Sequence, residues 1–278
     1  MIEILEVAFK RERKEYYLNN LNIPFTIGDY AIVSAERGED MGRVFQKGRL
    51  PQPKKGREPL ENVLRKATEE DQNKLLELRN KEGGIFRTCK AKIEEHGLAM
   101  KLVDVEYRFD AHKITFYFTA DKRIDFRALV KDLAAIYRTR IEMHQIGVRE
   151  EARRVGGYGC CGLKLCCTTV IEDFDPVTTQ MAKDQNLILT PSKLSGVCGR
   201  LMCCLAYEWN LYKAEMERFP QVGKKITTEK GKGKIERADI FRNLIYISYE
   251  SGGEEKITLE KYENLKKKKK GAPEQAKT

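Results

Sequence analysis

The sequence predicts an α+β protein whose layered core consists of antiparallel strands and helices. A cysteine-rich helical region follows this core, and small β-barrel-like units lie near both ends. Three observations predict this fold class: the strand and helix periodicities of residues 98–148, the cysteines gathered between 160 and 204, and two glycine-rich β patterns. With 278 residues, 41% of them hydrophobic and 34% charged, the chain is long enough for two or three small cores.

Changes of pattern along the chain divide it into six expected segments. They are an N-terminal small β unit, a helical segment, the α+β core, a cysteine-rich cluster-binding region, a C-terminal small β unit and a basic tail. Their bounds are 1–56, 57–97, 98–155, 156–220, 221–265 and 266–278. Glycine and proline at several of these boundaries are typical of turns between elements.

Both small β units are predicted from strand-like runs that are broken by glycine. In the first unit, residues 2–10 and 15–18 have the pattern of strands, and residues 26–33 that of a turn leading into a strand. The glycines of 36–44 permit positive φ and predict a hairpin. A similar pattern returns at 222–235. We interpret both as strongly bent units of the KOW or Tudor type, and two unrelated hairpins remain the alternative.

The helical segment is predicted from apolar residues at helical spacing over residues 58–82. Thr68 and Asp71 resemble a capping box, which predicts that a new helix begins there. The glycine pair 83–84 is expected to weaken any continuation of that helix. Residues 85–96 resume the helical pattern.

The α+β core begins with a strand over 98–107 and a partner strand over 114–119, which is rich in residues that favour strands. Asp125 is expected to cap the helix that follows. The apolar face of this helix is predicted to contain Phe126, Leu129, Val130, Leu133, Ala134 and Ile136. Residues 140–148 are expected to return as a third strand.

The cysteine-rich region contains one short pattern twice. Residues 161–167 are CGLKLCC, and residues 198–204 are CGRLMCC. Each copy has Cys-Gly, two variable residues, an apolar residue and then Cys-Cys. Of the 8 cysteines, only Cys89 lies outside this region, and we expect it to be a core residue. A helix is predicted over 201–217.

Charge and hydropathy indicate where the protein works. The formal net charge of +10 suggests a polyanionic partner, although it can also serve solubility. A run of five lysines, 266–270, adds to the positive charge and has the composition of a solvated tail. No apolar run is long enough to cross a bilayer, and the N-terminus does not resemble a secretory signal. We therefore expect a cytoplasmic protein without membrane insertion.

In the cytoplasm thiols stay reduced, and clustered cysteines there more often bind metal than form disulfides. Thiolates are soft ligands that favour zinc, copper(I) or iron–sulfur clusters. The four-residue gap beside a glycine also occurs in ferredoxin-type ligand runs, whereas structural zinc sites usually have Cys-x2-Cys spacing. Buried cysteines that only pack are the alternative. Adjacent cysteines point in different directions, so both members of a pair are not expected to bind one small ion.

The sequence gives no pattern for catalysis. The G-x-G-x-x-G of residues 157–162 follows a charged stretch rather than a strand, which argues against a dinucleotide site. The three histidines, His96, His112 and His144, are dispersed along the chain. Neither a Cys–His pair nor a carboxylate dyad can be argued from spacing, so we expect a protein that is not an enzyme.

Three longer stretches carry a resemblance to a known family. Residues 156–162 are GGYGCCG, residues 174–177 and 181–187 are FDPV and MAKDQNL, and residues 193–208 are KLSGVCGRLMCCLAYE. Together they resemble the YaaT/RicT family of bacterial cytoplasmic proteins. The likeness is close over about 95–208. Cys160 and the glycine pair 83–84 depart from the family pattern.

The resemblance implies a [4Fe–4S] cofactor and a regulatory complex with two small helical proteins, RicA and RicF. It also implies association with RNase Y, promotion of mRNA processing, and effects on sporulation, competence and biofilm formation. The candidate cluster ligands that it implies are Cys161, Cys166, Cys167, Cys198, Cys203 and Cys204. Because one cluster takes four thiolates, six candidates suggest a second cluster that a partner chain completes.

Two other functions remain as alternatives. A zinc-stabilised nucleic-acid-binding protein would explain the positive charge, and the basic segments are candidates for direct contact with RNA. A redox enzyme would use the paired cysteines as dithiols, but neither copy has Cys-x-x-Cys spacing. The zinc protein would bind RNA in a strongly salt-dependent way, whereas the redox enzyme would turn over a disulfide substrate.

Overall fold

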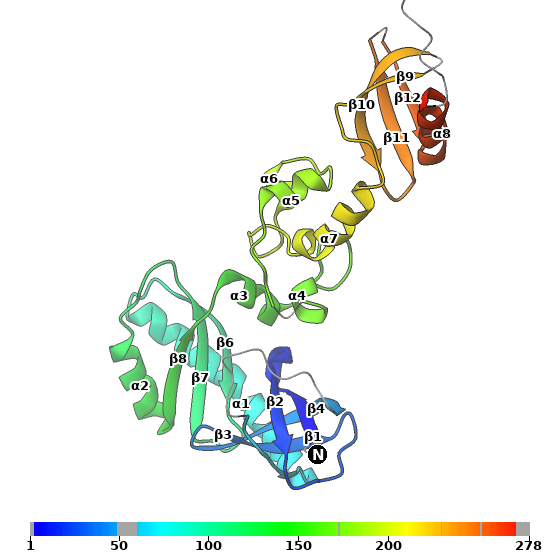
Figure 1. The fold of residues 1–278 in the computed structure, drawn as a ribbon. Helices are drawn as coiled ribbons and strands as arrows, with labels where there is room; N and C mark the ends of the chain where they lie inside the picture. Colours follow the sequence, from blue (N-terminus) through cyan, green and yellow to red (C-terminus); the bar gives the residue numbers. More distant parts are fainter. Residues whose placement is uncertain (1–2, 49–59, 172, 229, 251, 271–278) are drawn as a thin grey trace, which may run out of the picture. The chain divides into compact units, whose positions relative to one another are not determined.

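The computed structural model describes residues 3–48, 60–171, 173–228, 230–250 and 252–270. The chain divides into two compact units, Met1–Thr169 and Val170–Thr278, which are coloured blue to green and green to red in Figure 1. Both units combine helices with largely antiparallel sheets, so the predicted α+β class is confirmed. Among the helices described, none has both the length and the apolar composition that a membrane span requires.

The first unit begins with a five-stranded antiparallel sheet in the order β2-β1-β4-β3-β5. Its elements are β1 (Glu3–Ala8), η1 (Lys10–Glu12), β2 (Lys14–Asn19), β3 (Tyr30–Ala35), β4 (Gly38–Gly48) and β5 (Val63–Lys66). The sheet curls, and its two edges approach each other where the Leu18 amide donates to the Glu61 carbonyl at 2.9 Å. Gly42 permits this curl, because a Cβ there would lie 2.5 Å from Val7.

The prediction of a helix over 58–82 is wrong in its first half. Residues 58 and 59 lie outside the described residues, and the following segment pairs with β3 as β5. Its apolar residues also fit a strand, because Val63 is buried in the core of the curled sheet. The helix α1 (Glu69–Glu95) begins after Thr68 with the predicted capping box.

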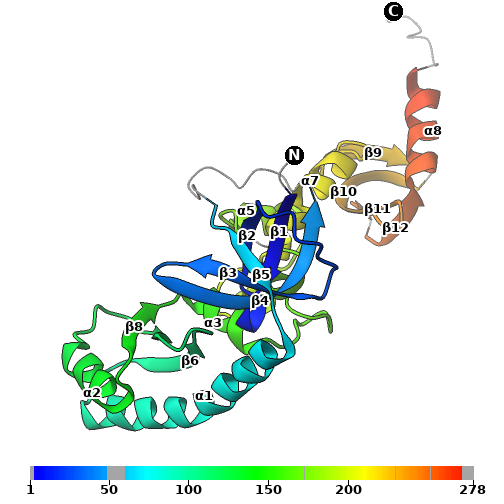
Figure 2. The same cartoon turned by 90° about the horizontal axis from the view of Figure 1, so that it is seen from below.

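The glycine pair 83–84 does not interrupt α1, contrary to the weakening expected from helix propensity. Tertiary packing explains this result, since the helix buries Ile85, Cys89 and Ile93 along one face after the pair. Figure 2 shows α1 as a long helix that continues past its middle without a break.

The core of the first unit is a three-stranded sheet in the order β6-β7-β8, with β6 (Lys101–Tyr107), β7 (Lys113–Thr119) and β8 (Arg140–Gln145). The β6–β7 pair is antiparallel, whereas β8 is parallel to β7, because α2 (Arg127–Tyr137) carries the chain back between them. Buried residues of α1 and α2 share one apolar cluster with this sheet. Ile136 is an exception to the predicted apolar face, since it is 49% exposed.

The helices α3 (Val148–Val155) and α4 (Cys166–Thr169) end the first unit. The second unit begins with three helices, α5 (Thr179–Asp184), α6 (Pro191–Leu194) and α7 (Cys204–Met216), and α7 falls within the predicted range 201–217. A four-stranded antiparallel sheet follows, in the order β12-β11-β10-β9. Its elements are β9 (Lys225–Thr228), β10 (Gly231–Asp239), β11 (Leu244–Tyr249) and β12 (Glu254–Thr258).

The last helix, α8 (Leu259–Lys270), packs against β11 and β12 (Figure 1). The lysine run 266–270, which we expected to be part of a tail, therefore forms the end of a helix. The final residues, 271–278, lie outside the described residues.

Candidate functional site

The first cysteine turn, residues 157–168, is a short hairpin that leads into α4. The Gly159 amide donates to the Leu163 carbonyl at 2.8 Å, and the Gly162 amide donates back to the Gly159 carbonyl at 3.0 Å. Gly162 has a φ of 79°, a conformation in which a residue with a Cβ is strained. The glycine after the first cysteine is therefore what allows the chain to turn.

The second cysteine turn, residues 194–205, has the same hydrogen bonds at equivalent positions. The Gly196 amide donates to the Arg200 carbonyl at 2.9 Å, and the Gly199 amide donates to the Gly196 carbonyl at 3.0 Å. Gly199 has a φ of 72°. The two copies of the sequence pattern thus fold into the same local structure, once in each unit.

A second glycine in each turn leaves space beside a sulfur atom. A Cβ on Gly159 would lie 3.4 Å from the Cys161 Sγ, and a Cβ on Gly196 would lie 3.8 Å from the Cys198 Sγ. Both are ordinary van der Waals distances, so a Cβ at either position would touch the first sulfur of the pattern without a clash. The second glycine of each turn therefore lies within contact distance of the first sulfur, at an equivalent position in both copies.

The other two cysteines of each pattern lie where a helix begins. Cys166 and Cys167 are the first residues of α4, while Cys203 is the N-cap of α7 and Cys204 its first residue. The six candidate thiols differ in exposure: Cys161 is exposed, Cys167 is buried, and the remaining four are half-buried (Cys166, Cys198, Cys203, Cys204).

Each turn is described within its own unit, and the three candidate cysteines of a turn share its backbone structure. In the described part of the chain, no group of three or more His, Cys, Asp or Glu side chains could hold a metal ion. Cys160 is an exposed residue of the first turn and is not one of the six candidates. Cys89 is fully buried in the core, as predicted, and burial raises the pKa of its thiol to about 12.

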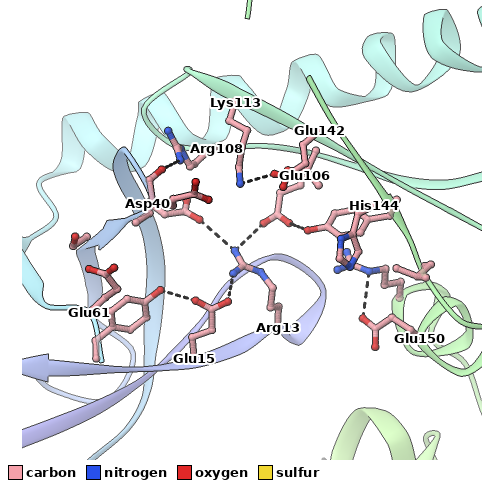
Figure 3. A pocket seen from close by; sticks show the side chains of 18 residues that line it. Arg13, Glu15, Asp40, Glu61, Glu106, Arg108, Lys113, Glu142, His144 and Glu150 are labelled. Atoms are coloured by element: carbon pink, nitrogen blue, oxygen red, sulfur yellow. Dashed lines mark hydrogen bonds and ion pairs between the residues drawn. The ribbon is translucent and has the colours of Figure 1, made fainter. Parts of the chain in front are cut away.

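The first unit also contains a charged cavity of about 510 Å³, which lies between the curled sheet and the three-stranded sheet (Figure 3). Arg13 is at its centre, with Nη2 3.2 Å from the Asp40 Oδ2 and 3.5 Å from the Glu106 Oε1. Burial by itself would lower the pKa of Arg13, but the carboxylates of Glu106, Glu15 and Asp40 outweigh it and raise that pKa. Burial also raises the pKa of the Asp40 carboxyl.

Arg154 lines the cavity from α3 and is only 6% exposed. Its guanidinium carbon lies 3.4 Å from the centre of the Tyr117 ring, and its Nη1 lies 3.6 Å from the Asp104 Oδ2. The Nε atom lies 3.4 Å from the Glu150 Oε1. These ion-pair and ring contacts, in which Nε and Nη1 make no hydrogen bond to any described residue, connect α3 to the three-stranded sheet, and α3 leads directly into the first cysteine turn.

Sequence reasoning missed this cavity. The sequence contains only a weak indication of it. Asp104 and Glu106 alternate with apolar residues in β6, and both carboxylates are buried. Buried charges in a strand require partners, and those partners come from distant parts of the sequence such as Arg13 and Arg154. Nothing in the local pattern identifies which cations they are.

Two family models match the chain. The PSP1 C-terminal conserved region matches residues 61–146, and the third domain of PSP1-like proteins matches residues 176–219. The chain is 44% identical over 249 residues to the stage 0 sporulation protein YaaT of Bacillus subtilis, with 89% of this chain and 90% of YaaT covered. The chain belongs to the YaaT/RicT family of PSP1 proteins.

Two fungal proteins share parts of this family sequence. A Schizosaccharomyces pombe protein, PB7E8.02, is 32% identical over 168 residues, which are 49% of this chain and 22% of that protein. Protein PSP1 of Saccharomyces cerevisiae is 46% identical over 44 residues, which are 16% of this chain and 5% of PSP1. No solved structure matches the chain.

The family models correspond to parts of the YaaT/RicT fold described above. The first covers the segment from just before β5 to just after β8, and therefore includes Glu106 and Tyr117 of the cavity. The second covers α5 to α7 and contains the second cysteine turn. The first cysteine turn lies between the two matched ranges.

Proposed function

We propose that this YaaT/RicT family member is a non-catalytic, [4Fe–4S]-binding subunit of a regulatory complex. In this proposal the complex associates with RNase Y in the cytoplasm and promotes mRNA processing, which affects sporulation, competence and biofilm formation. The observation that carries the proposal is the repetition of one cysteine turn, with the same hydrogen bonds and the same positive-φ glycine in both copies. The name of the Bacillus subtilis relative, a stage 0 sporulation protein, supports the part that concerns sporulation.

The residues that would hold the cluster are the six cysteines of the two turns. Cys161 and Cys198 lie within the tight part of each turn, directly before its positive-φ glycine, and the pairs 166–167 and 203–204 lie at a helix start. Thiolate sulfurs are the usual ligands of iron–sulfur clusters, and a glycine lies beside both Cys161 and Cys198. When bound, a cluster would supply redox or oxygen sensitivity, or a rigid link between segments.

One [4Fe–4S] cluster binds four thiolates, so the six candidate cysteines are two more than a single cluster requires. We propose that the remaining thiols bind part of a second cluster, which partner chains complete. RicA-like and RicF-like small helical proteins are the proposed partners. The exposed or half-buried state of five of the six sulfurs is compatible with ligands that arrive from another chain.

Metal analysis of the protein tests this proposal. The full chain would be purified without oxygen, alone and together with the proposed partners, and its iron, sulfide and zinc would be measured beside the visible spectrum. We expect about four irons and four sulfides per cluster, with a broad absorption shoulder that fades in air. Stoichiometric zinc without sulfide in both preparations would contradict the proposal and favour a zinc-stabilised nucleic-acid-binding protein.

A further inference from the structure

The sheet of the second unit has two different faces. One face is packed, since its apolar residues form a cluster with residues at the end of α7 and from α8. The buried members of this cluster are Phe219, Ile235, Ala238, Ile245, Ile247, Ile257 and Leu259. Gly233 belongs to the same face, where a Cβ would lie 2.7 Å from Ile247. This face is therefore part of the core of the unit.

The opposite face carries cations. Lys232 and Lys234 alternate with the buried residues of β10, so their side chains point away from the core. Strand register places Lys225 of β9 opposite Lys234, and Lys256 of β12 opposite Tyr246. We call this surface the basic face; its cations are Lys225, Lys232, Lys234, Arg237 and Lys256, all of them exposed.

These cations have no carboxylate at ion-pair distance among the residues that the structure describes. The ion pairs of this sheet instead involve Lys230, Lys261 and Arg242, which pair with Glu255 and Asp239. Lys225 and Lys234 are directly opposite each other, an arrangement of like charges that destabilises a sheet. An anionic ligand would relieve this repulsion.

An aromatic ring lies at the centre of the basic face. The guanidinium carbon of Arg237 lies 3.9 Å from the centre of the Tyr246 ring, and the Lys256 Nζ lies 5.4 Å from it. Tyr246 is buried beneath these two side chains. The short distance indicates that the Arg237 guanidinium covers one side of the Tyr246 ring. The outer side of this guanidinium is a planar cationic surface on which a nucleobase can stack.

We propose that the basic face binds single-stranded RNA, with the lysines contacting phosphates and Arg237 stacking on a base. The choice of RNA rests on the proposed function, whereas the basic face itself does not depend on a cluster. A face that combines several cations with a planar stacking surface is typical of single-strand binding. The neighbouring residues on this face are Thr227, Ser248 and one exposed carboxylate, Glu254, which lies opposite Ser248, so the face offers little apolar surface to a lipid bilayer.

Fluorescence anisotropy with a labelled oligouridylate of about 12 nucleotides tests the proposal on the full-length chain. The test variant is Lys232→Gln/Lys234→Gln/Arg237→Gln, and the matched control is Lys122→Gln/Arg127→Gln/Lys131→Gln, which removes three exposed cations of the first unit. Every variant keeps the lysine run 266–270. We expect the test variant to lose about tenfold in affinity at low salt, and its slope of log K against log salt to fall by about 2.

A second variant, Arg237→Lys, keeps the charge but removes the planar group. We expect it to lose affinity severalfold, because lysine does not offer a guanidinium plane to a base. Wild-type affinity in this variant would contradict the stacking role. Thermal unfolding of each variant shows whether the fold is kept.

Equal losses in the test variant and in the matched control would overturn the proposal. A second result would also overturn it: the protein binds vesicles of phosphatidylglycerol and phosphatidylcholine through the same three cations but does not bind the oligouridylate. Iron content of the anaerobically purified complex is measured on the same variants. If the test variant keeps normal iron content but loses RNA binding, the result supports the basic face as the RNA site. If the wild type contains no iron but still binds RNA, the result rejects only the proposed cluster.

Discussion

The two cysteine turns have the same backbone but different supports. The first turn follows α3, which is held by Arg154 through ionic contacts and a stacked Tyr117 ring. The second turn begins at Leu194 and ends at Leu205, which lie together in an apolar cluster with Ala182. The Cys-Gly pattern therefore determines the turn itself, while neighbouring residues determine how firmly it is held.

This difference also affects the thiols. Cys167 is buried in the first turn, whereas the equivalent Cys204 is half-buried. The opposite holds for the first cysteine of each pattern, since Cys161 is exposed and Cys198 is half-buried. A ligand that both turns bind would consequently meet two sets of sulfurs with the same spacing and different accessibility.

The largest effect is expected from the apolar support of the second turn. Leu205→Ala should lower the free energy of unfolding by about 3 kcal/mol, because Leu205 is only 2% exposed and its removal leaves a cavity. Leu211→Ala on the same helix is the matched control, since Leu211 is 56% exposed. Urea denaturation measures both. Equal destabilisation by the two variants would show that the apolar cluster around Leu205 does not hold this turn.

Removal of the ionic support of the first turn should have a smaller effect. Arg154→Met should cost about 2 kcal/mol, because Asp104 loses one cation but keeps Lys10, whose Nζ lies 2.7 Å away. Hydrogen exchange should rise at the Leu165 amide, which donates to Gly157, and stay unchanged at the Met202 amide of the second turn. The control is Arg153→Met. Unchanged exchange at Leu165 would contradict the role given to Arg154.

The turn glycines should show that the backbone requirement is the same in both copies. Gly162→Ala and Gly199→Ala should each cost about 1 kcal/mol, because both residues have positive φ while no atom lies near the added Cβ. Gly83→Ala in α1 should have the opposite sign and stabilise by about 0.5–1 kcal/mol, since a Cβ there also meets open space. Chemical denaturation of the three variants checks both signs.

The last prediction concerns the thiols in the absence of any ligand, where the first turn contrasts with the core. Burial raises the pKa of Cys89 from 9.0 to about 12, so the stabilisation from keeping this thiol neutral is present below pH 9.0 and lost as the pH rises towards 12. In native protein between these values, iodoacetamide should label the exposed Cys161 and leave Cys89 unmodified. Mass spectrometry of the labelled peptides measures this. Labelling of Cys89 at the rate of Cys161 would contradict the assigned burial.

Much of the fold could be predicted from the sequence, because most elements have a clear period. The capping box at Thr68 and the β6–β7 hairpin are examples. The segment before Thr68 was mistaken for a helix because four apolar residues at helical spacing also fit a short strand, and only the pairing of β5 with β3 decides between them. The expectation that the glycine pair 83–84 weakens the helix was wrong for a related reason. Helix propensity is a local quantity, and it does not include the stabilisation from burying Ile85 and Cys89.

The candidate site could be predicted in part. The repeated pattern identified the six cysteines and the glycines that turn the chain, and the structure gives both copies the same turn. The charged cavity and the basic face could not be found, because each depends on residues that pair only after the strands have formed. Arg13 and Arg154 are an example, since they line the same cavity but lie far apart in the sequence.

The most direct test of the cysteine turns is the iron and sulfide content of the anaerobically assembled complex after one substitution in each turn. Cys166→Ser and Cys198→Ser would be compared with wild type and with Cys89→Ala, whose thiol lies in the core. We predict that each turn variant loses iron, sulfide and the visible chromophore while Cys89→Ala keeps them. Full iron and sulfide in both turn variants, with unchanged assembly, would contradict the assignment of the turns as the cluster site.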